Sequence, residues 1–419
     1  MTTIFEEFVR NLSSPLSSLL LQILAILIAA RVCGRIVAYF GQPQVIGEIL
    51  AGICLGPSFL QALAPATHAF LFPAGSVQRL FFLSQIGIVL FMFIVGLELD
   101  AKAFRSKARS AAVISTASIL LPFALGAALA VWLYPTYGSS QKGLHAFVLF
   151  MGIAMSITAF PVLARIIQEQ GLARTQIGTL AITCAAVNDV TAWCLLALVV
   201  GLVQSGTGVG AVATTVLTLL FTLFMLLVAR PLLRDRLGPS SRAEQFSAAS
   251  LSIVFMGLLL SAWITEMIGI HALFGAFLMG LTLPEHDQFK EKLIARIQDV
   301  TTIVLLPLFF ALTGLRTQLG ALDDWQSWLA CLLVLAVAIV GKFGGAAIAA
   351  RVMGHGWRTS CLLGALMNTR GLVELVVLNL GYDLGILSPK MFTIMVVMAV
   401  ATTVMAGPIV HYLKPHAAE

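Results

Sequence analysis

Charged residues are scarce in this chain. Asp, Glu, Lys and Arg together make up only 11% of its 419 residues, whereas apolar residues make up 59%. Soluble globular domains carry about 25% charged residues and far less apolar content, and the mean hydropathy here is +0.98. This composition excludes an ordinary soluble domain and indicates that the lipid bilayer is the solvent for most of the chain.

Sequence motifs for nucleotide binding, hydrolysis and metal binding are also missing. The chain contains no GxxxxGK, HExxH or GxSxG motif. Its 6 cysteines form no CxxC pair, which favours a role as small core residues. Basic residues are scattered between apolar stretches, so the net charge of +6 does not indicate a nucleic-acid partner. We expect neither enzymatic activity nor a cofactor.

Hydropathy predicts an all-α polytopic membrane protein. An apolar stretch of about 20 residues can cross the bilayer as a helix. The chain contains thirteen candidate stretches, which we expect to form a single transmembrane domain over 1–419. The expected spans are 17–40, 43–61, 80–99, 110–134, 144–168, 176–203, 209–230, 246–264, 268–283, 299–318, 326–350, 359–381 and 391–413.

The positions of Lys and Arg predict the orientation of these spans. Most of the 25 basic residues fall in alternate loops, and cytoplasmic loops carry the excess of such residues. We therefore expect the N-terminus outside and the C-terminus cytoplasmic, in a bacterial inner membrane. The polar stretch 230–245 is expected to be a cytoplasmic loop that joins halves 1–230 and 246–419. Glu6 and Glu7 argue against a cleavable signal, and the chain ends soon after the last expected span, so we expect no regulatory domain beyond it.

One short motif occurs in both halves of the chain. FMFIVGL at 91–97 aligns with FFALTGL at 309–315, at the ends of the third and tenth expected spans. Seven crossings separate these spans, so a true repeat has opposite orientations in the membrane. Inverted repeats are typical of secondary transporters, which bind ions between the repeats near the midplane. The alternative is that apolar helices resemble one another.

Four charged residues lie well inside expected spans: Asp189, Lys342, Arg370 and Glu374. A charge at the bilayer centre costs about 3 kcal/mol even on lenient scales, so such residues are candidates for function. A carboxylate such as Asp189 can bind a dehydrated cation or a proton, but binding of one disfavours the other. This competition is the minimum requirement for cation/proton exchange. The alternative is an acid that a neighbouring helix neutralises to lock packing.

Asn188 and the fifth span supply candidate oxygen ligands for a cation beside Asp189. Asn188 adds a hard amide oxygen, which suits an alkali cation, although an amide can instead bridge two helices. Pro161, in SITAFP at 156–161, removes a backbone donor. The helix is therefore expected to open around Ile157 and Thr158, which places Thr158 among the cation-binding residues. A proline kink that only shapes packing is the alternative.

The twelfth span carries a pair of opposite charges and a second helix break. Arg370 and Glu374 are four residues apart, so on a continuous helix they share a face and form a structural ion pair. Direct contact of Glu374 with the cation is the alternative. Asn368, Thr369 and Gly371 predict that this helix also opens.

Lys342 lies among glycines in VGKFGG at 340–345, which allow neighbouring helices to approach closely. We expect it to pair with Asp189 when no cation is bound, which lowers the cost of burying that carboxylate. The alternative is a lysine that extends to the membrane interface.

Together these motifs resemble the monovalent cation:proton antiporter-2 family, within the sodium/hydrogen exchanger superfamily. The similar stretches, spread over nearly the whole transmembrane region, are PQVIGEILAG at 43–52, GPS at 56–58, GLEL at 96–99, SITAFPVLA at 156–164, ND at 188–189, GK at 341–342 and NTRG at 368–371.

The resemblance implies a core with two crossed, partly unwound helices, a dimerisation panel and an elevator-like alternation. It assigns cation and proton binding to Asp189, the neighbouring role to Asn188 and the charge partner to Lys342. Members with a second aspartate in place of Asn188 include electrogenic sodium exchangers, so the charge stoichiometry stays open here.

The sequence thus predicts a homodimeric antiporter that exchanges K+ or Na+ for H+ at Asp189. The choice between the two cations depends on ligand geometry and stays open. Two other classes are kept as alternatives: a cation channel or uniporter in which Asp189 only lines a pore, and a membrane sensor with the same fold that does not transport.

Overall fold

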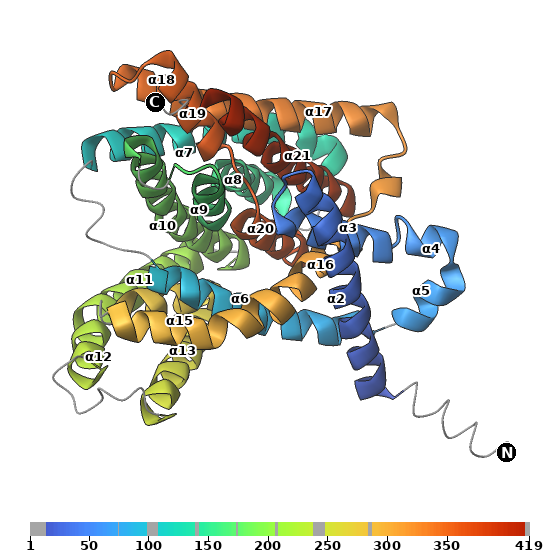
Figure 1. Ribbon diagram of the computed structural model, residues 1–419, viewed down its shortest axis with the longest axis horizontal. Coiled ribbons are helices and arrows are strands. Elements are labelled where there is room, and N and C mark those ends of the chain that lie inside the picture. The colour runs from blue at the N-terminus through green and yellow to red at the C-terminus, as the bar shows by residue number, and fades with distance from the viewer. Residues whose placement is uncertain are drawn as a thin grey trace. The chain divides into compact units, whose positions relative to one another are not determined.

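The structure of the protein is a computed structural model that describes residues 14–73, 75–98, 108–138, 142–172, 175–205, 208–237, 248–283 and 287–414 (Figure 1). Regular structure in these ranges is helical, apart from one isolated bridge between Gly138 and Leu387. The prediction of an all-α fold is confirmed.

Ten helices within the described ranges are long and apolar enough to cross a membrane, and each coincides with a predicted span. The other predicted spans, 144–168, 268–283 and 359–381, contain shorter helices, and two of these spans are broken in the middle. The prediction of a polytopic membrane protein therefore holds, whereas the count of thirteen spans is not confirmed.

The chain divides into two compact units. Unit 1 comprises residues 1–91 and 299–323, and unit 2 comprises 92–298 and 324–419. Each unit takes segments from both predicted halves of the sequence. Residues 230–237 of the loop expected to join those halves are helical instead (α12, Arg230–Leu237). The remaining loop residues, 238–245, lie outside the described residues, so the division into halves stays a prediction.

The helices of unit 1 are α2 (Pro15–Tyr39), α3 (Gln44–Leu55), α4 (Leu60–Leu63), α5 (Pro65–Leu71), most of α6 (Val77–Glu98), the π-helical turn η2 (Thr301–Leu305), α16 (Leu306–Arg316) and the 3-10 turn η3 (Leu319–Ala321).

Unit 2 contains the end of α6 and the remaining helices: α7 (Ala108–Tyr137), α8 (Gly143–Ser156), α9 (Phe160–Glu169), α10 (Gln176–Ser205), α11 (Gly208–Phe224), α12 (Arg230–Leu237), α13 (Ala248–Ile268), α14 (Ala272–Thr282), most of α15 (Asp287–Val300), α17 (Trp325–Ile339), α18 (Gly345–Val352), α19 (Trp357–Met367), α20 (Leu372–Asp383) and α21 (Pro389–Leu413). Two π-helical turns, η1 (Met225–Ala229) and η4 (Val340–Gly344), interrupt long helices of this unit.

Glycines allow α3 and α16 of unit 1 to pack backbone against backbone. A Cβ atom on Gly52 would lie 2.0 Å from the carbonyl oxygen of Ala311, and one on Gly314 would lie 2.2 Å from that of Ile49. Both distances are far below van der Waals contact, so glycine is required for this approach. The apolar core of the unit consists of Ile26, Phe72, Leu80, Leu308, Ala311, Leu312 and Leu315.

Unit 2 contains the same kind of glycine contact, between the end of α6 and α14. A Cβ atom on Gly96 would lie 2.2 Å from the carbonyl oxygen of Phe277, and one on Gly280 would lie 2.3 Å from that of Phe93. Gly96 and Gly314 occupy the same position in the two copies of the repeated motif. Each copy packs in the same way on its own neighbour, as expected for an internal repeat.

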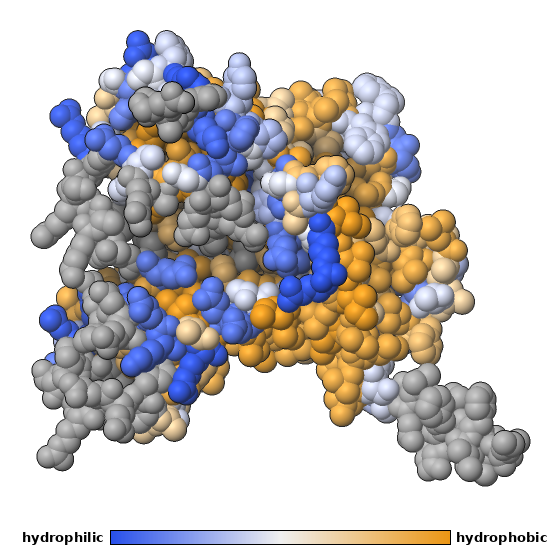
Figure 2. Space-filling view, in the orientation of Figure 1, coloured by the Kyte–Doolittle hydropathy of each residue, from blue (hydrophilic) through white to orange (hydrophobic). Residues whose placement is uncertain are grey.

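Helix α2 shows how the protein surface matches a bilayer. Every fourth side chain along one face is apolar and between 52% and 66% exposed: Leu16, Leu20, Leu24, Ile28, Val32 and Ile36. Figure 2 shows hydrophobic residues along this helix. In water such a stripe would be unfavourable, whereas lipid tails solvate it. The stripe therefore supports a membrane-facing position for α2.

Candidate functional site

The four intramembrane charges predicted from the sequence all lie in the core of unit 2. The side chain of Asp189 is 1% exposed, and those of Lys342, Arg370 and Glu374 are 0% exposed. Burial of a charge without compensation is costly, so the groups around each side chain determine what the site can do.

Two broken helices meet at this site. The chain opens at residues 157–159, between α8 and α9, and again at 368–371, between α19 and α20. The amide of Ala159 donates to the carbonyl oxygen of Thr369 at 3.1 Å, and the hydroxyl of Thr158 donates to that of Met367 at 3.2 Å. The two breaks are thus hydrogen-bonded to each other, and the predicted crossing of two partly unwound helices is confirmed.

Proline explains where the first break ends. Pro161 is the second residue of α9. In the first turn of a helix the backbone amides have no helical acceptor, so the missing amide hydrogen of proline costs no hydrogen bond there. Ile157, which follows the last residue of α8, is extended, with φ −73° and ψ 140°. The prediction that the helix opens around Ile157 and Thr158 is confirmed.

Arg370 and Glu374 form the predicted buried ion pair, with 2.8 Å between Nη1 of Arg370 and Oε1 of Glu374. The expectation that the two residues share one face of a continuous helix was wrong, because the helix is interrupted between them. Arg370 lies in the break, and Glu374 lies in the first turn of α20. The pair therefore closes the break onto the positive N-terminal end of α20, where a carboxylate is favoured.

Arg370 also donates hydrogen bonds to backbone carbonyls at the end of α8, the helix before the other break. Its guanidinium donates to the carbonyl oxygens of Ala154 at 3.1 Å and Met155 at 2.8 Å, in the last turn of α8. The last carbonyls of a helix lack internal partners. In addition, the hydroxyl of Thr403 on α21 donates to the carbonyl oxygen of Arg370 at 2.5 Å. Arg370 thus joins α8, α20 and α21.

The side-chain amide of Asn188, on α10, has one possible orientation. It lies 3.0 Å from the hydroxyl of Ser118 and 2.9 Å from that of Thr158. Each hydroxyl has one hydrogen, and each already donates it to a backbone carbonyl, Ser118 to Ser115 and Thr158 to Met367. Both hydroxyls must therefore accept from the NH2 group of Asn188, which turns its oxygen Oδ1 away from them.

Three buried oxygens on adjacent residues have no hydrogen-bond donor within the described part of the chain. They are Oδ1 of Asn188 and both carboxylate oxygens of Asp189. The carboxylate lies near the amide of Phe160, the first residue of α9, without a well-formed hydrogen bond to it. Buried polar atoms without partners are costly, so the carboxylate of Asp189 favours a proton or a positive ion.

Lys342 lies in the π-helical turn η4 and is bound by backbone oxygens. Its ammonium donates to the carbonyl oxygen of Ser118 on α7 at 3.0 Å and to that of Ser156 at the end of α8. It forms no direct ion pair with Asp189 in this structure, so the predicted pairing stays a prediction. π-Helical turns within long helices are frequent at functional sites.

Sequence reasoning missed Ser118, which contacts both Asn188 and Lys342. One signal was available: Pro122, four residues further along α7, has no amide hydrogen, so the carbonyl of Ser118 lacks its helical donor. The alternative that Glu374 contacts a cation stays open, since its Oε2 is buried and has no partner among the described residues. No group of three or more His, Cys, Asp or Glu side chains in the described ranges could hold a metal ion.

Two crossed, broken helices beside a buried carboxylate are typical of secondary transporters, in which ions bind at the helix breaks. The chain belongs to the sodium/hydrogen exchanger family, whose transmembrane profile matches residues 18–413. This confirms the superfamily that the sequence motifs indicated.

Individual relatives agree with this family. The Na(+)/H(+) antiporter NhaS4 of Synechocystis sp. is 41% identical over 404 residues, which cover 96% of this chain and 98% of that protein. Cation/H(+) antiporter 20 of Arabidopsis thaliana is 40% identical over 96% of this chain, and K(+)/H(+) antiporter 1 of Saccharomyces cerevisiae is 33% identical over 98% of it. The chain spans about half the length of these plant and yeast proteins, 48% in both cases.

A solved structure shows the same fold. The sodium proton antiporter MjNhaP1 from Methanocaldococcus jannaschii superposes with a TM-score of 0.65, covering 96% of this chain and 98% of that one. The sequence identity is 13%, so this similarity is informative for the fold alone.

The first prediction concerns the buried ion pair. Arg370→Gln or Glu374→Gln leaves one charge buried alone, which should lower stability by roughly 3–5 kcal/mol. Thermal unfolding in detergent measures this loss. Exchanging the two residues should restore little, because it places a carboxylate against the carbonyls of Ala154 and Met155. Wild-type stability of both single variants would contradict a structural role for the pair.

Proposed function

We propose that this protein is a secondary active antiporter that exchanges a monovalent cation, K+ or Na+, for H+ at Asp189. The observation that carries the proposal is that three buried oxygens, on Asn188 and Asp189, have no hydrogen-bond donor among the described residues. A proton on the carboxylate or a cation between these oxygens removes the same cost of burial. Because one carboxylate cannot carry both, each ion displaces the other.

Asn188 and Thr158 act as further cation ligands in this proposal. All candidate ligands are hard oxygens, which alkali cations prefer over nitrogen or sulfur. Thr158 donates to one carbonyl and accepts from Asn188, so one lone pair of its hydroxyl is still available to a cation. Both cations stay in the proposal because the relatives are named as Na+ and as K+ exchangers.

Lys342 is the charge partner of Asp189 in this proposal. When the cation leaves, the ammonium moves from the carbonyl oxygens of Ser118 and Ser156 to the carboxylate. The π-helical turn and the glycines around Lys342 support such a movement, because they loosen the backbone that carries it. Backbone carbonyls are weaker partners than a carboxylate, so the exchange of partners is favourable only once the cation has gone.

The transport cycle that we propose is an elevator-like alternation in a homodimer. The protein lies in a cell membrane, with its N-terminus outside and its C-terminus on the cytoplasmic side. The hydrogen bonds between the two breaks support this proposal, since they let the two broken helices move as one body. The orientation rests on the distribution of Lys and Arg along the sequence.

Substitution of Asp189 tests the proposal. Asp189→Asn should fold and insert but lose exchange, because an amide neither holds a proton reversibly nor balances a cation. The assay is cation-dependent proton movement in proteoliposomes. Asp324→Asn is the matched control: Asp324 caps α17 outside the membrane spans through its bond to the Ser327 amide at 2.8 Å, and Asn caps helices equally well.

Wild-type exchange by folded Asp189→Asn would refute the site. Ion conduction without exchange in the unmodified protein would favour the channel. Absence of both exchange and conduction would favour the sensor.

Ser118 gives a second test, because it orients the amide of Asn188. Ser118→Ala removes one of two hydroxyls that accept from the amide, a loss of about 0.5–1.5 kcal/mol. We expect the KM for the cation to rise about 2- to 10-fold, with little change in maximal rate. Ser118→Thr keeps the hydroxyl and should retain most of the affinity. An unchanged KM in Ser118→Ala would show that Asn188 does not act through this orientation.

A further inference from the structure

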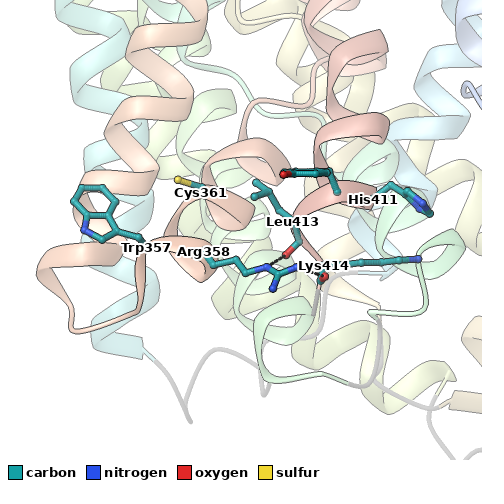
Figure 3. Close-up of a pocket in the computed structure, with 7 residues that line it drawn as sticks. Trp357, Arg358, Cys361, His411, Leu413 and Lys414 are labelled. Carbon is teal, nitrogen blue, oxygen red and sulfur yellow. Dashed lines mark hydrogen bonds between the residues drawn. The ribbon is translucent and has the colours of Figure 1, made fainter. Parts of the chain in front are cut away.

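A pocket of about 740 Å³ lies where the end of α21 meets the start of α19. Figure 3 shows Arg358 reaching from α19 to the end of α21, with Trp357 on one side and His411 and Lys414 on the other. This pocket is separate from the site at Asp189, and neither the proposed exchange nor the fold accounts for its chemistry.

Basic side chains gather in the described lining of this pocket. Arg358, His411 and Lys414 are among its lining residues, and no acidic residue lines it within the described part of the chain. Such a lining attracts a negatively charged ligand.

The cationic groups keep hydrogen-bond capacity for a ligand. Arg358 uses Nε and Nη2 to donate to the carbonyl oxygens of Leu413 at 3.2 Å and Lys414 at 3.3 Å. A guanidinium has five N–H donors, so others are available. Lys414 donates to the neutral Oε1 of Gln170 at 3.3 Å, which leaves its positive charge uncompensated by that contact. A phosphate group, with several acceptor oxygens and negative charge, fits these donors.

The position of the pocket indicates what carries the phosphate. It lies at the end of the candidate span Pro389–Leu413, where a helix leaves the hydrocarbon for the headgroup region. Trp357 and Tyr412 are 62% and 80% exposed at its edge, and these two residue types gather at that depth of a membrane. Basic pockets between transmembrane helices bind anionic lipid headgroups.

We propose that this pocket binds the phosphate headgroup of an anionic phospholipid. The lipid phosphate contacts Arg358 and Lys414, and the acyl chains extend along the membrane-facing surface beside Trp357 and Tyr412. The lipid holds α19 and α21 together at their membrane-interface ends. Helix α19 ends at the break at 368–371, and Thr403 of α21 donates a hydrogen bond to Arg370 within that break. A lipid that binds both helices only in the folded state therefore stabilises the folded protein.

Lipid-dependent thermal unfolding of the full chain in a neutral detergent tests this proposal. Added phosphatidylglycerol should raise the unfolding temperature, whereas phosphatidylcholine and inorganic phosphate should have little effect. Arg358→Gln and Lys414→Gln should each weaken the apparent affinity for phosphatidylglycerol about fivefold. Lys390→Gln is the matched control, since it removes the same charge from the opposite end of α21, and it should respond as the wild type does.

Arg358→Gln also removes a cap from α21 and can lower stability by itself, so Lys414→Gln and native mass spectrometry of retained lipid provide independent readouts. Equal stabilisation by the two phospholipids would overturn the proposal. So would wild-type affinity for phosphatidylglycerol in both pocket variants. Stabilisation by inorganic phosphate that both variants abolish would identify a site for free anions and overturn the lipid assignment.

Discussion

The rest of this site depends on one buried carboxylate that has no hydrogen-bond donor among the described residues. Asp189 is 1% exposed, and neither of its oxygens accepts a hydrogen bond from the described residues. A folded protein seldom tolerates such a group unless its charge is neutralised. The neighbouring polar groups do not neutralise it: the NH2 group of Asn188 is held by two hydroxyls, and Lys342 is held by two carbonyls. The carboxylate is thereby left available to an ion.

The helix breaks make this arrangement possible. In an intact helix the carbonyls and amides bond one another, so few are available to a neighbour. Opening α8 at Ser156 frees a carbonyl for Lys342, and opening the chain at 368–371 places Arg370 against the last turn of α8. The positive charge of Arg370 is in turn compensated by Glu374. Two ionisable residues therefore maintain the breaks, whereas Asp189 and Lys342 form no ion pair among the described residues.

The sequence predicted the parts of this site whose signals are local. Asp189, Lys342, Arg370 and Glu374 stand out as charges in apolar stretches, and Pro161 marks the first break. It did not predict which groups would meet. Lys342 and Ser118 are 224 residues apart, and the lysine binds a backbone oxygen that every residue possesses. The geometry of Arg370 was also misjudged, because spacing by four implies a shared face only when the helix continues.

Competition between the proton and the cation at Asp189 is the central claim, and the pH dependence of cation affinity tests it most directly. Transport currents from proteoliposomes on a solid support give the KM for Na+ and K+ at each pH. We expect the KM to rise as the pH falls, by at most about tenfold per pH unit. The maximal current at saturating cation should change little. A KM that is independent of pH throughout the active range would contradict a shared site.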